Sequence, residues 1–214
     1  MLRPIPDLVL ASGSPRRASV LRQLGLPFEV VVPDVDETLR PGEPGDLAAE
    51  RLARAKAERG TGPGLLAFGF DTIVVEGDET LGKPADEAEA RAMLARLAGG
   101  THEVFTGIAA ATPGRIESAV ERTRVRVRRL SEEDVAAYVA TGEPMDKAGA
   151  YGIQGAGASL VDGIVGDFFN VMGFPVQRFL ELLGRFGLRY AFGALAVAPD
   201  GGSGGAAAPA PGDR

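Results

Sequence analysis

Apolar positions along the chain recur with two spacings, one typical of helices and the other typical of strands. In the first, an apolar residue returns every three or four positions, and in the second a short apolar run ends at turn residues. Helices are predicted over residues 15–24, 46–58, 86–98 and 175–183, with another beginning at 131–134, and strands over residues 8–11, 28–32, 65–75, 103–111, 118–130 and 159–165. Because helices and strands alternate, we expect an α/β fold with a mixed sheet.

One carboxylate, Asp71, interrupts the apolar run of the third predicted strand. An isolated carboxylate in a buried strand is costly, because nothing replaces the water that it loses unless a cation or hydrogen bonds are supplied. We therefore expect a metal ion or lysine side chains to face Asp71. A buried charge with such partners is typical of a reaction centre, so Asp71 is interpreted as the centre of this protein's chemistry.

The composition excludes several kinds of site. The 214 residues include 23 Lys and Arg against 29 Asp and Glu, for a net charge of -6, no cysteine and a single histidine. Wholesale binding to nucleic acid or to an anionic membrane is therefore not expected. Disulfides, thiolate nucleophiles and histidine-rich metal sites are excluded as well. Oxygen ligands and a hard cation remain.

The two ends of the chain bound the folded part. Prolines and an acid near the N-terminus break the apolar segment that a signal peptide needs, and no apolar run reaches transmembrane length, so we expect a cytoplasmic protein. Residues 199–214 are rich in Gly, Ala and Pro with nothing to bury, and we expect them to be disordered. Residues 1–198 are predicted to form one domain, because no linker divides them.

A small loop at residues 12–17 is a candidate phosphate site. A predicted strand runs through Ser12 and Ser14 into a helix that begins with proline and carries Arg16 and Arg17. Free N–H groups at a helix start, together with adjacent guanidinium groups, bind phosphate oxygens well. The alternative is a capped helix with two solvated arginines, and local physics leaves both open.

Two further features have a functional and a plain interpretation. Lys56 falls on the apolar stripe of its helix, either as an ammonium that answers a buried charge or as a stem covering core surface. Glu37 ends an acidic cluster over residues 34–37 that suits Mg²⁺ or Mn²⁺, although wet acidic loops are common. On its own the acidic cluster favours the plain interpretation.

Residues 77–83 almost match the pattern of a P-loop. Pro84 stands where a hydroxyl residue would hold magnesium, and it prevents a helix from continuing through Lys83. The segment is therefore not interpreted as a P-loop. Lys83 is still expected to reach a phosphate as a point charge.

The glycine-rich segment 145–155 carries Gln154, whose amide can read the edge of a base, while the alternative is a surface loop. Arginines at 122, 124, 126 and 128 alternate with Thr and Val, which favours a solvated outer face of a strand over a nucleic-acid patch. His102 is expected to be a hydrogen-bonded structural residue rather than a catalyst.

These segments occur in the order and spacing of one known family. The chain resembles the Maf family over about residues 8–188, in Ser-Gly-Ser-Pro-Arg-Arg from residue 12, Asp-Glu-Thr from 36, Lys56, Asp71-Thr72, Gly-Lys-Pro from 82, Thr-His-Glu-Val from 101, Thr-Gly from 106, Asp-Lys-Ala-Gly-Ala-Tyr-Gly-Ile-Gln-Gly from 146 and Asn-Val-Met-Gly-Phe-Pro from 170. The resemblance implies the two-lobed fold of inosine triphosphate pyrophosphatases, with a cleft between lobes on an elongated mixed sheet. It also implies hydrolysis of nucleoside triphosphates to the monophosphate and pyrophosphate with a divalent cation, Mg²⁺ or Mn²⁺.

The resemblance also implies roles for individual residues. Asp71 matches the family's proton acceptor, and Glu37 with Asp71 its metal ligands. The family's phosphate-binding basic residues are matched by Arg16, Arg17, Lys56 and Lys83, of which Lys56 and Lys83 are expected to be catalytic together with Asp71. Ser12 and Ser14 are expected to bind the substrate. Arg16, Thr72 and Gln154 match the subfamily that prefers dTTP and UTP, which extends the expectation to modified pyrimidine nucleotides. Phe70 departs from the family's usual small residue. The alternative is a nucleotide-binding regulator of septum formation without turnover, and the resemblance alone suggests a homodimer.

Overall fold

The computed structural model describes residues 4–199. A twisted seven-stranded sheet runs through the centre of the protein. Its strands are β1 (Asp7–Ala11), β2 (Glu29–Val31), β3 (Leu65–Glu76), β4 (Glu79–Leu81), β5 (Thr101–Thr112), β6 (Arg115–Val127) and β7 (Val161–Val165). The order is β2-β1-β3-β5-β6-β7, and β4 pairs with β3. Only β1 pairs in parallel, with β2 and β3, so the predicted mixed sheet is confirmed.

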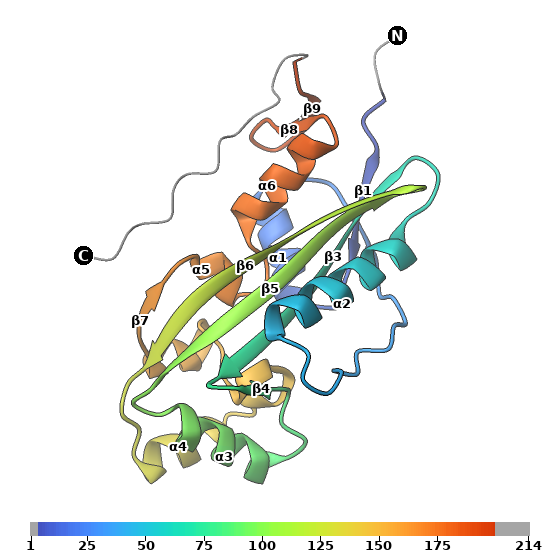
Figure 1. The fold of residues 1–214 in the computed structure, drawn as a ribbon. Helices are drawn as coiled ribbons and strands as arrows, with labels where there is room; N and C mark the ends of the chain where they lie inside the picture. The colour runs from blue at the N-terminus through green and yellow to red at the C-terminus, as the bar shows by residue number, and fades with distance from the viewer. Residues whose placement is uncertain (1–3, 200–214) are drawn as a thin grey trace, which may run out of the picture.

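Helices lie over the two ends and the middle of the long strands (Figure 1). They are α1 (Pro15–Gln23), α2 (Gly45–Gly60), α3 (Glu87–Leu97), α4 (Glu132–Val139), α5 (Phe168–Val171) and α6 (Val176–Arg185), and the short 3-10 helices are η1 (Glu143–Asp146), η2 (Ala148–Ala150) and η3 (Gly155–Leu160). Strands β8 (Leu188–Tyr190) and β9 (Leu195–Val197) form a separate hairpin beyond α6. Every helix within residues 4–199 falls short of the length and apolar character of a membrane span.

The protein has two large apolar cores, one at each end of the sheet. One packs α1 and α6 against the sheet and includes Phe68 and Phe179, whose ring centroids lie 4.7 Å apart. The other joins α3 and α4 to the opposite end through Leu94 and Val125. Two separate cores on one continuous sheet make the molecule two-lobed, as the resemblance implied.

Glycines bring α2 unusually close to the middle of the sheet. A Cβ atom on Gly69 of β3 would lie 2.2 Å from the Ala53 carbonyl oxygen, and one on Gly107 of β5 would lie 2.2 Å from the Ala49 carbonyl oxygen. The helix therefore lies directly against the two central strands (Figure 1). This contact carries the inward face of α2 to Asp71, which pairs in register with Gly107.

Local signals were accurate in type and less accurate at their ends. The helix predicted to begin at 131–134 is α4, and Ser131 and Asp134 form a capping box at its start. The helix predicted over 46–58 extends from Gly45 to Gly60, with Pro44 rather than Asp46 at its N-cap. The strand predicted from 159 begins at Val161, because residues 159 and 160 close a 3-10 helix. The tail predicted to be disordered lies, apart from residue 199, outside the described residues.

Candidate active site

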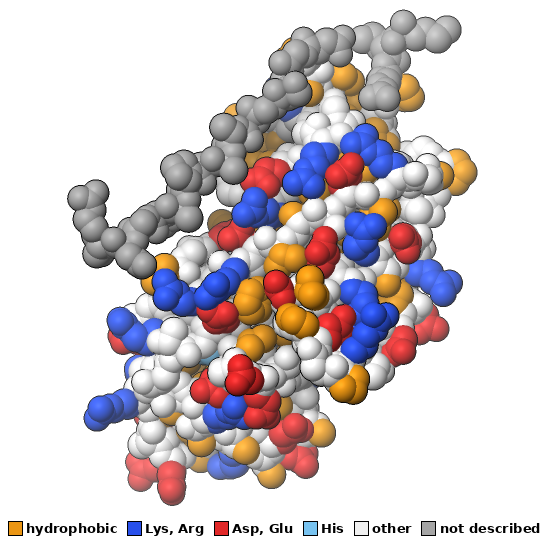
Figure 2. All heavy atoms as spheres, in the orientation of Figure 1, with side chains coloured by type: hydrophobic (Ala, Val, Ile, Leu, Met, Phe, Trp, Pro, Cys, Tyr) orange, Lys and Arg blue, Asp and Glu red, His pale blue; other side chains and the backbone are white. Residues whose placement is uncertain are grey.

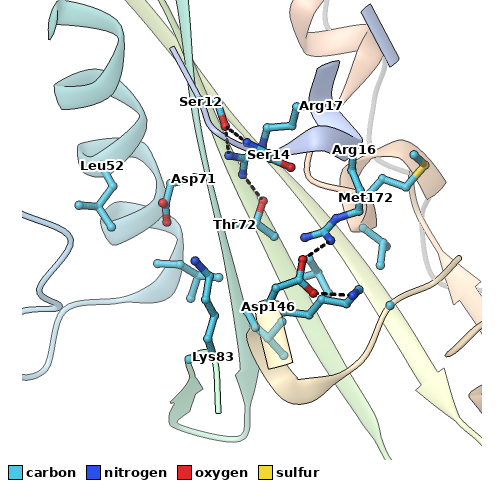
Figure 3. Close-up of a pocket in the computed structure, with 18 of the residues that line it drawn as sticks. Ser12, Ser14, Arg16, Arg17, Leu52, Asp71, Thr72, Lys83, Asp146 and Met172 are labelled. Atoms are coloured by element: carbon cyan, nitrogen blue, oxygen red, sulfur yellow. Dashed lines mark hydrogen bonds and ion pairs between the residues drawn. The ribbon is translucent and has the colours of Figure 1, made fainter. Parts of the chain in front are cut away.

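A cavity of about 640 Å³ lies between the two cores. Its volume is in the range of about 300–1,000 Å³ that is usual for small-molecule sites. Its lining includes every site residue predicted from the sequence, namely Ser12, Ser14, Arg16, Arg17, Glu37, Lys56, Asp71, Thr72, Lys83 and Gln154. Figure 3 shows how the side chains from α1, β3 and the β4 region face this space. Tertiary structure therefore gathers segments that are more than a hundred residues apart.

Asp71 and Lys56 form an ion pair in the wall of the cavity. Lys56 Nζ lies 2.7 Å from Asp71 Oδ1 and 2.6 Å from Glu37 Oε1. The side chains of Lys56 and Asp71 are 9% and 12% exposed, so both are largely removed from water. Of the two interpretations of Lys56, the ammonium that answers a buried charge is the one that the structure adopts.

Burial and Lys56 act in opposite directions on the two carboxylates. Burial raises the pKa of Asp71 above its usual value, although the charge and hydrogen bond of Lys56 oppose the rise. Burial also works to raise the pKa of Glu37, but Lys56, Lys83 and Arg17 outweigh it and the pKa of Glu37 falls. The difference has a simple cause, since Glu37 is half exposed and keeps more of its solvation.

Only one member of the acidic cluster at 34–37 reaches the ion pair. Glu37 lies in the irregular segment between β2 and α2 and turns towards Lys56. Asp36 instead accepts a hydrogen bond from the backbone N–H of Thr38 at 2.9 Å and stays exposed, as Asp34 does. The plain interpretation of the cluster therefore holds for Asp34 and Asp36.

The two adjacent arginines differ in their surroundings. Arg17 donates to the carbonyl oxygens of Gly173 and Phe70 and to the hydroxyls of Ser12 and Thr72, at 2.8–3.2 Å. Burial lowers the pKa of Arg17 to about 10, which leaves it charged at neutral pH. Its donors are thus directed to the protein itself, and Arg17 joins α1 to the loop after β1, to β3 and to the segment after α5.

Arg16 is more open and crosses the cavity. Its Nη1 lies 3.0 Å from Asp146 Oδ2, and Asp146 also contacts Lys147 Nζ at 2.6 Å (Figure 3). Sequence reasoning did not assign a role to Asp146 or Lys147, although both stand in the polar segment that it singled out. Ser14 forms the N-cap of α1 without a side-chain hydrogen bond, so its hydroxyl makes no cap at the helix start.

Thr72 is held by a chain of hydroxyl groups that sequence reasoning missed. Thr106 donates to the Asn170 carbonyl oxygen at 3.0 Å, and its hydroxyl lies 3.0 Å from that of Thr72. Since Thr106 has only one proton to donate, Thr72 donates to Thr106 and accepts from Arg17. Buried polar residues at 106 and 170 were the only signal that could have indicated this chain.

Lys83 and Gln154 lie on the cavity wall with exposed side chains. Lys83 has no ion-pair partner among residues 4–199, and Figure 3 shows its ammonium directed towards Asp71. The segment around it is irregular and α3 begins only at Glu87, so the rejection of a P-loop agrees with the geometry. A free ammonium at this position supplies positive charge to the cavity.

The remaining features have structural explanations. Arg122, Arg126 and Arg128 pair with Glu103, Asp162 and Asp134 on the outer surface. Basic and acidic side chains are interspersed on the face shown in Figure 2 rather than gathered in one basic patch. His102 is buried, and its Nε2 lies 2.7 Å from the Tyr151 hydroxyl. The prediction of a structural histidine is therefore confirmed.

Comparison with known proteins identifies the family. The model of a family described as Maf-like protein matches residues 7–186. The chain belongs to the Maf family. Three Maf relatives carry the name dTTP/UTP pyrophosphatase. One from Symbiobacterium thermophilum is 51% identical over 85% of this chain and 94% of its own, and one from Moorella thermoacetica is 50% identical over 85% and 95%. A third, from Bacillus thuringiensis, is 43% identical over 85% and 96%. The Maf match at residues 7–186 spans both lobes and the predicted cavity residues.

Proposed function

We propose that this Maf protein hydrolyses nucleoside triphosphates to the monophosphate and pyrophosphate, with dTTP and UTP as preferred substrates. The observation that carries the proposal is the buried pair of Asp71 and Lys56 in a cavity that also receives Arg16 and Lys83. A carboxylate beside several cationic groups suits the attack of water on a polyanion. The names of the relatives, which are 43–51% identical, support the choice of this reaction and of pyrimidine nucleotides as substrates.

Asp71 is the proton acceptor in this mechanism. The oxygen of a water molecule bonds to the α-phosphorus while the proton of that water passes to Asp71. The bond from the α-phosphorus to the oxygen that bridges to the β-phosphate breaks, and pyrophosphate leaves. The raised pKa of Asp71 helps, because a base is more effective as its pKa approaches the working pH. Lys56, Lys83 and Arg16 offset the phosphate charge.

We propose further that Glu37 and Asp71 hold a divalent cation, Mg²⁺ or Mn²⁺. Both carboxylates contact the same ammonium, since Lys56 Nζ lies within 2.7 Å of each, so their oxygen atoms lie close together on the cavity wall. Residues 4–199 contain no group of three or more Asp, Glu, His or Cys side chains arranged for a metal. Two carboxylates fit Mg²⁺, which commonly takes its other ligands from water and substrate phosphates. When bound, the cation would neutralise phosphate charge.

Base preference is assigned to Arg16, Thr72 and Gln154. The Gln154 amide offers both a donor and an acceptor, as uracil and thymine do on their pairing edge. Thr72 has its proton directed to Thr106, so towards a ligand it can act only as an acceptor. Because the Thr72 proton points away from the cavity, the Thr72 hydroxyl suits a nucleotide base that presents an N–H group to it.

The test is pyrophosphate release from a panel of normal and modified triphosphates, with Mg²⁺, Mn²⁺ or chelator. The wild-type chain is expected to prefer dTTP and UTP and to need the cation. The Asp71→Asn variant is expected to lose at least about a hundredfold in kcat, which is the scale of a lost general base. Asp78→Asn, in the exposed turn before β4, is the matched control. Tight nucleotide binding without turnover, or full activity of Asp71→Asn, would contradict the proposal and favour a regulator.

We also propose that the protein works in the cytoplasm, where nucleoside triphosphates are made and used, and that it forms a homodimer. The first follows from the proposed substrate and the second from the family resemblance alone. Light scattering coupled to size-exclusion chromatography would measure the mass, and a monomer at micromolar concentration would contradict the dimer.

A further inference from the structure

The segment that carries Gln154 is fastened on both sides by one pair of side chains. Tyr138 of α4 accepts a hydrogen bond from the Gly152 backbone N–H at 3.2 Å. Glu143 of η1 accepts from the backbone N–H groups of Ala156 and Gly157 at 2.9 and 3.0 Å. The Tyr138 hydroxyl donates to Glu143 Oε1 at 2.9 Å, which joins the two anchors into one unit.

Glycines allow the segment to wrap closely around this pair. A Cβ atom on Gly157 would lie 2.3 Å from the Gly152 carbonyl oxygen and 2.6 Å from the Tyr138 hydroxyl. One on Gly155 would lie 2.7 Å from Glu143 Oε2, and Gly155 has a φ of +69°, which other residues rarely adopt. The backbone path around Gln154 therefore depends on the Tyr138 and Glu143 side chains at close range.

The pair is built as an ionised acceptor and a neutral phenol. Burial works to raise the pKa of Glu143, but hydrogen bonds from Gly157, Ala156 and Tyr138 outweigh it, and the pKa lies below its usual value. Burial raises the pKa of Tyr138. Glu143 is therefore a carboxylate that only accepts, which suits three donors, and an amide in its place would turn a donor towards backbone N–H groups.

Glu143 is also connected to Arg16, on the opposite wall of the cavity, through Lys147 and Asp146. Lys147 Nζ donates to the Glu143 carbonyl oxygen at 2.5 Å and to Asp146 Oδ1 at 2.6 Å. Asp146 in turn pairs with Arg16. Neither Tyr138 nor Glu143 lines the cavity, so their contacts act on the lining residues rather than on a ligand.

We propose that Tyr138 and Glu143 are positioning residues that hold Gln154 in the conformation that reads the pyrimidine base. The proposal rests on the proposed function. Base contacts lie away from the reacting α-phosphorus, so loosening the segment weakens substrate binding and base preference while the chemical step continues. Ordering the segment before the substrate arrives spares the binding step that entropic cost.

The test compares Tyr138→Phe and Glu143→Gln with the wild-type chain. For either variant, KM for dTTP and UTP is expected to rise roughly tenfold, as for the loss of one or two hydrogen bonds, with kcat within about twofold. Preference for dTTP over GTP should fall by a similar factor. Two matched controls are expected to change neither KM nor base preference. One is Glu133→Gln, on the exposed first turn of α4. The other is Tyr190→Phe, which removes a hydroxyl that donates to the Leu24 carbonyl oxygen.

Amide hydrogen exchange without nucleotide gives an independent measurement. The amides of Gly152, Ala156 and Gly157 should exchange at least about tenfold faster in both variants, while amides in β3 stay protected. Unchanged exchange, or faster exchange with wild-type KM and base preference, would overturn the positioning role. If Glu143→Gln does not fold, Tyr138→Phe decides, because it removes a single hydroxyl.

Failure of the proposed function would be visible separately. A wild-type chain without pyrophosphate release would contradict turnover, and calorimetric binding of dTTP and GTP to the same variants would then decide the positioning role. Loss of dTTP preference in binding would support it, and equal preference in variant and wild type would overturn it.

Discussion

Lys56 Nζ lies 2.7 Å from Asp71 Oδ1, in an ion pair whose side chains are only about a tenth exposed. The two residues come from α2 and β3, which the small residues of both elements allow to lie in direct contact. The ammonium is shared with Glu37 at 2.6 Å. One basic side chain therefore organises the carboxylates on which the proposed chemistry depends.

Removal of Lys56 should destabilise the protein. Lys56→Met leaves Asp71 buried without its counter-charge, and we expect the free energy of unfolding to fall by about 3–5 kcal/mol. The double variant Lys56→Met/Asp71→Asn should lose less than Lys56→Met alone, because the buried charge is removed too. Urea denaturation measures both. Lys83→Met, at an exposed lysine, is the control, and additive effects in the double variant would contradict the buried pair.

Adjacent arginines should respond differently to the same substitution. Arg17→Lys loses the fork that bonds four oxygen atoms, and we expect a loss of about 3 kcal/mol in the free energy of unfolding. Arg16→Lys should change stability by less than about 1 kcal/mol, because its single ion pair is partly exposed. Thermal and urea unfolding would test this, and equal losses would show that Arg17 is not the structural member.

Close packing of α2 on the sheet predicts a strong effect at Gly107. Gly107→Ala places a methyl group 2.2 Å from the Ala49 carbonyl oxygen, so α2 must shift, and we expect a loss of about 3 kcal/mol in stability with reduced activity. Gly184→Ala in α6 is the matched control. Its added Cβ meets nothing within 4 Å, and it should stabilise the helix by about 0.5–1 kcal/mol. A neutral Gly107→Ala would contradict the close approach.

His102 should make stability depend on pH. Burial lowers the pKa of His102 to about 4, against about 6.5 when unfolded, so the unfolded chain binds the extra proton between these values. The stability that the neutral His102 contributes to the free energy of unfolding is fully present above pH 6.5. It is lost as pH falls towards 4, and the loss is on the order of 3 kcal/mol. His102→Gln should flatten this part of the stability profile. NMR titration of the single histidine measures the pKa directly, and a value near 6.5 would contradict the burial effect.

Much of the fold followed from local patterns, and the exceptions have physical causes. The long strands and the helices α1, α2, α3, α4 and α6 were predicted because their apolar residues recur with the period of the element, whereas the four-residue helix α5 was not predicted. The hairpin of β8 and β9 was not predicted, because three-residue strands carry too little pattern. Ser159 was assigned to a strand and closes a 3-10 helix instead, since small residues and glycine permit either conformation.

The candidate site divides in the same way. Asp71, Lys56 and Gln154 were singled out because each is a polar group in an unexpected place, and the structure brings them to one cavity. Local sequence could not separate Arg16 from Arg17, because what a guanidinium bonds depends on Gly173 and Thr72, which are distant in the chain. The anchoring by Tyr138 and Glu143 was missed for the same reason.

The sequence by itself determined the kinds of element, the faces that become buried, and the exclusion of cysteine chemistry and of histidine-rich metal sites, because these depend on residue type and short-range period. Tertiary structure decided which charges meet. Glu37 rather than Asp36 reaches Lys56. Arg17 donates its hydrogen bonds to oxygen atoms of the protein, while Arg16 crosses the cavity to Asp146. Such pairings depend on sheet register and on how closely two elements approach, and neither is encoded in the period of apolar residues.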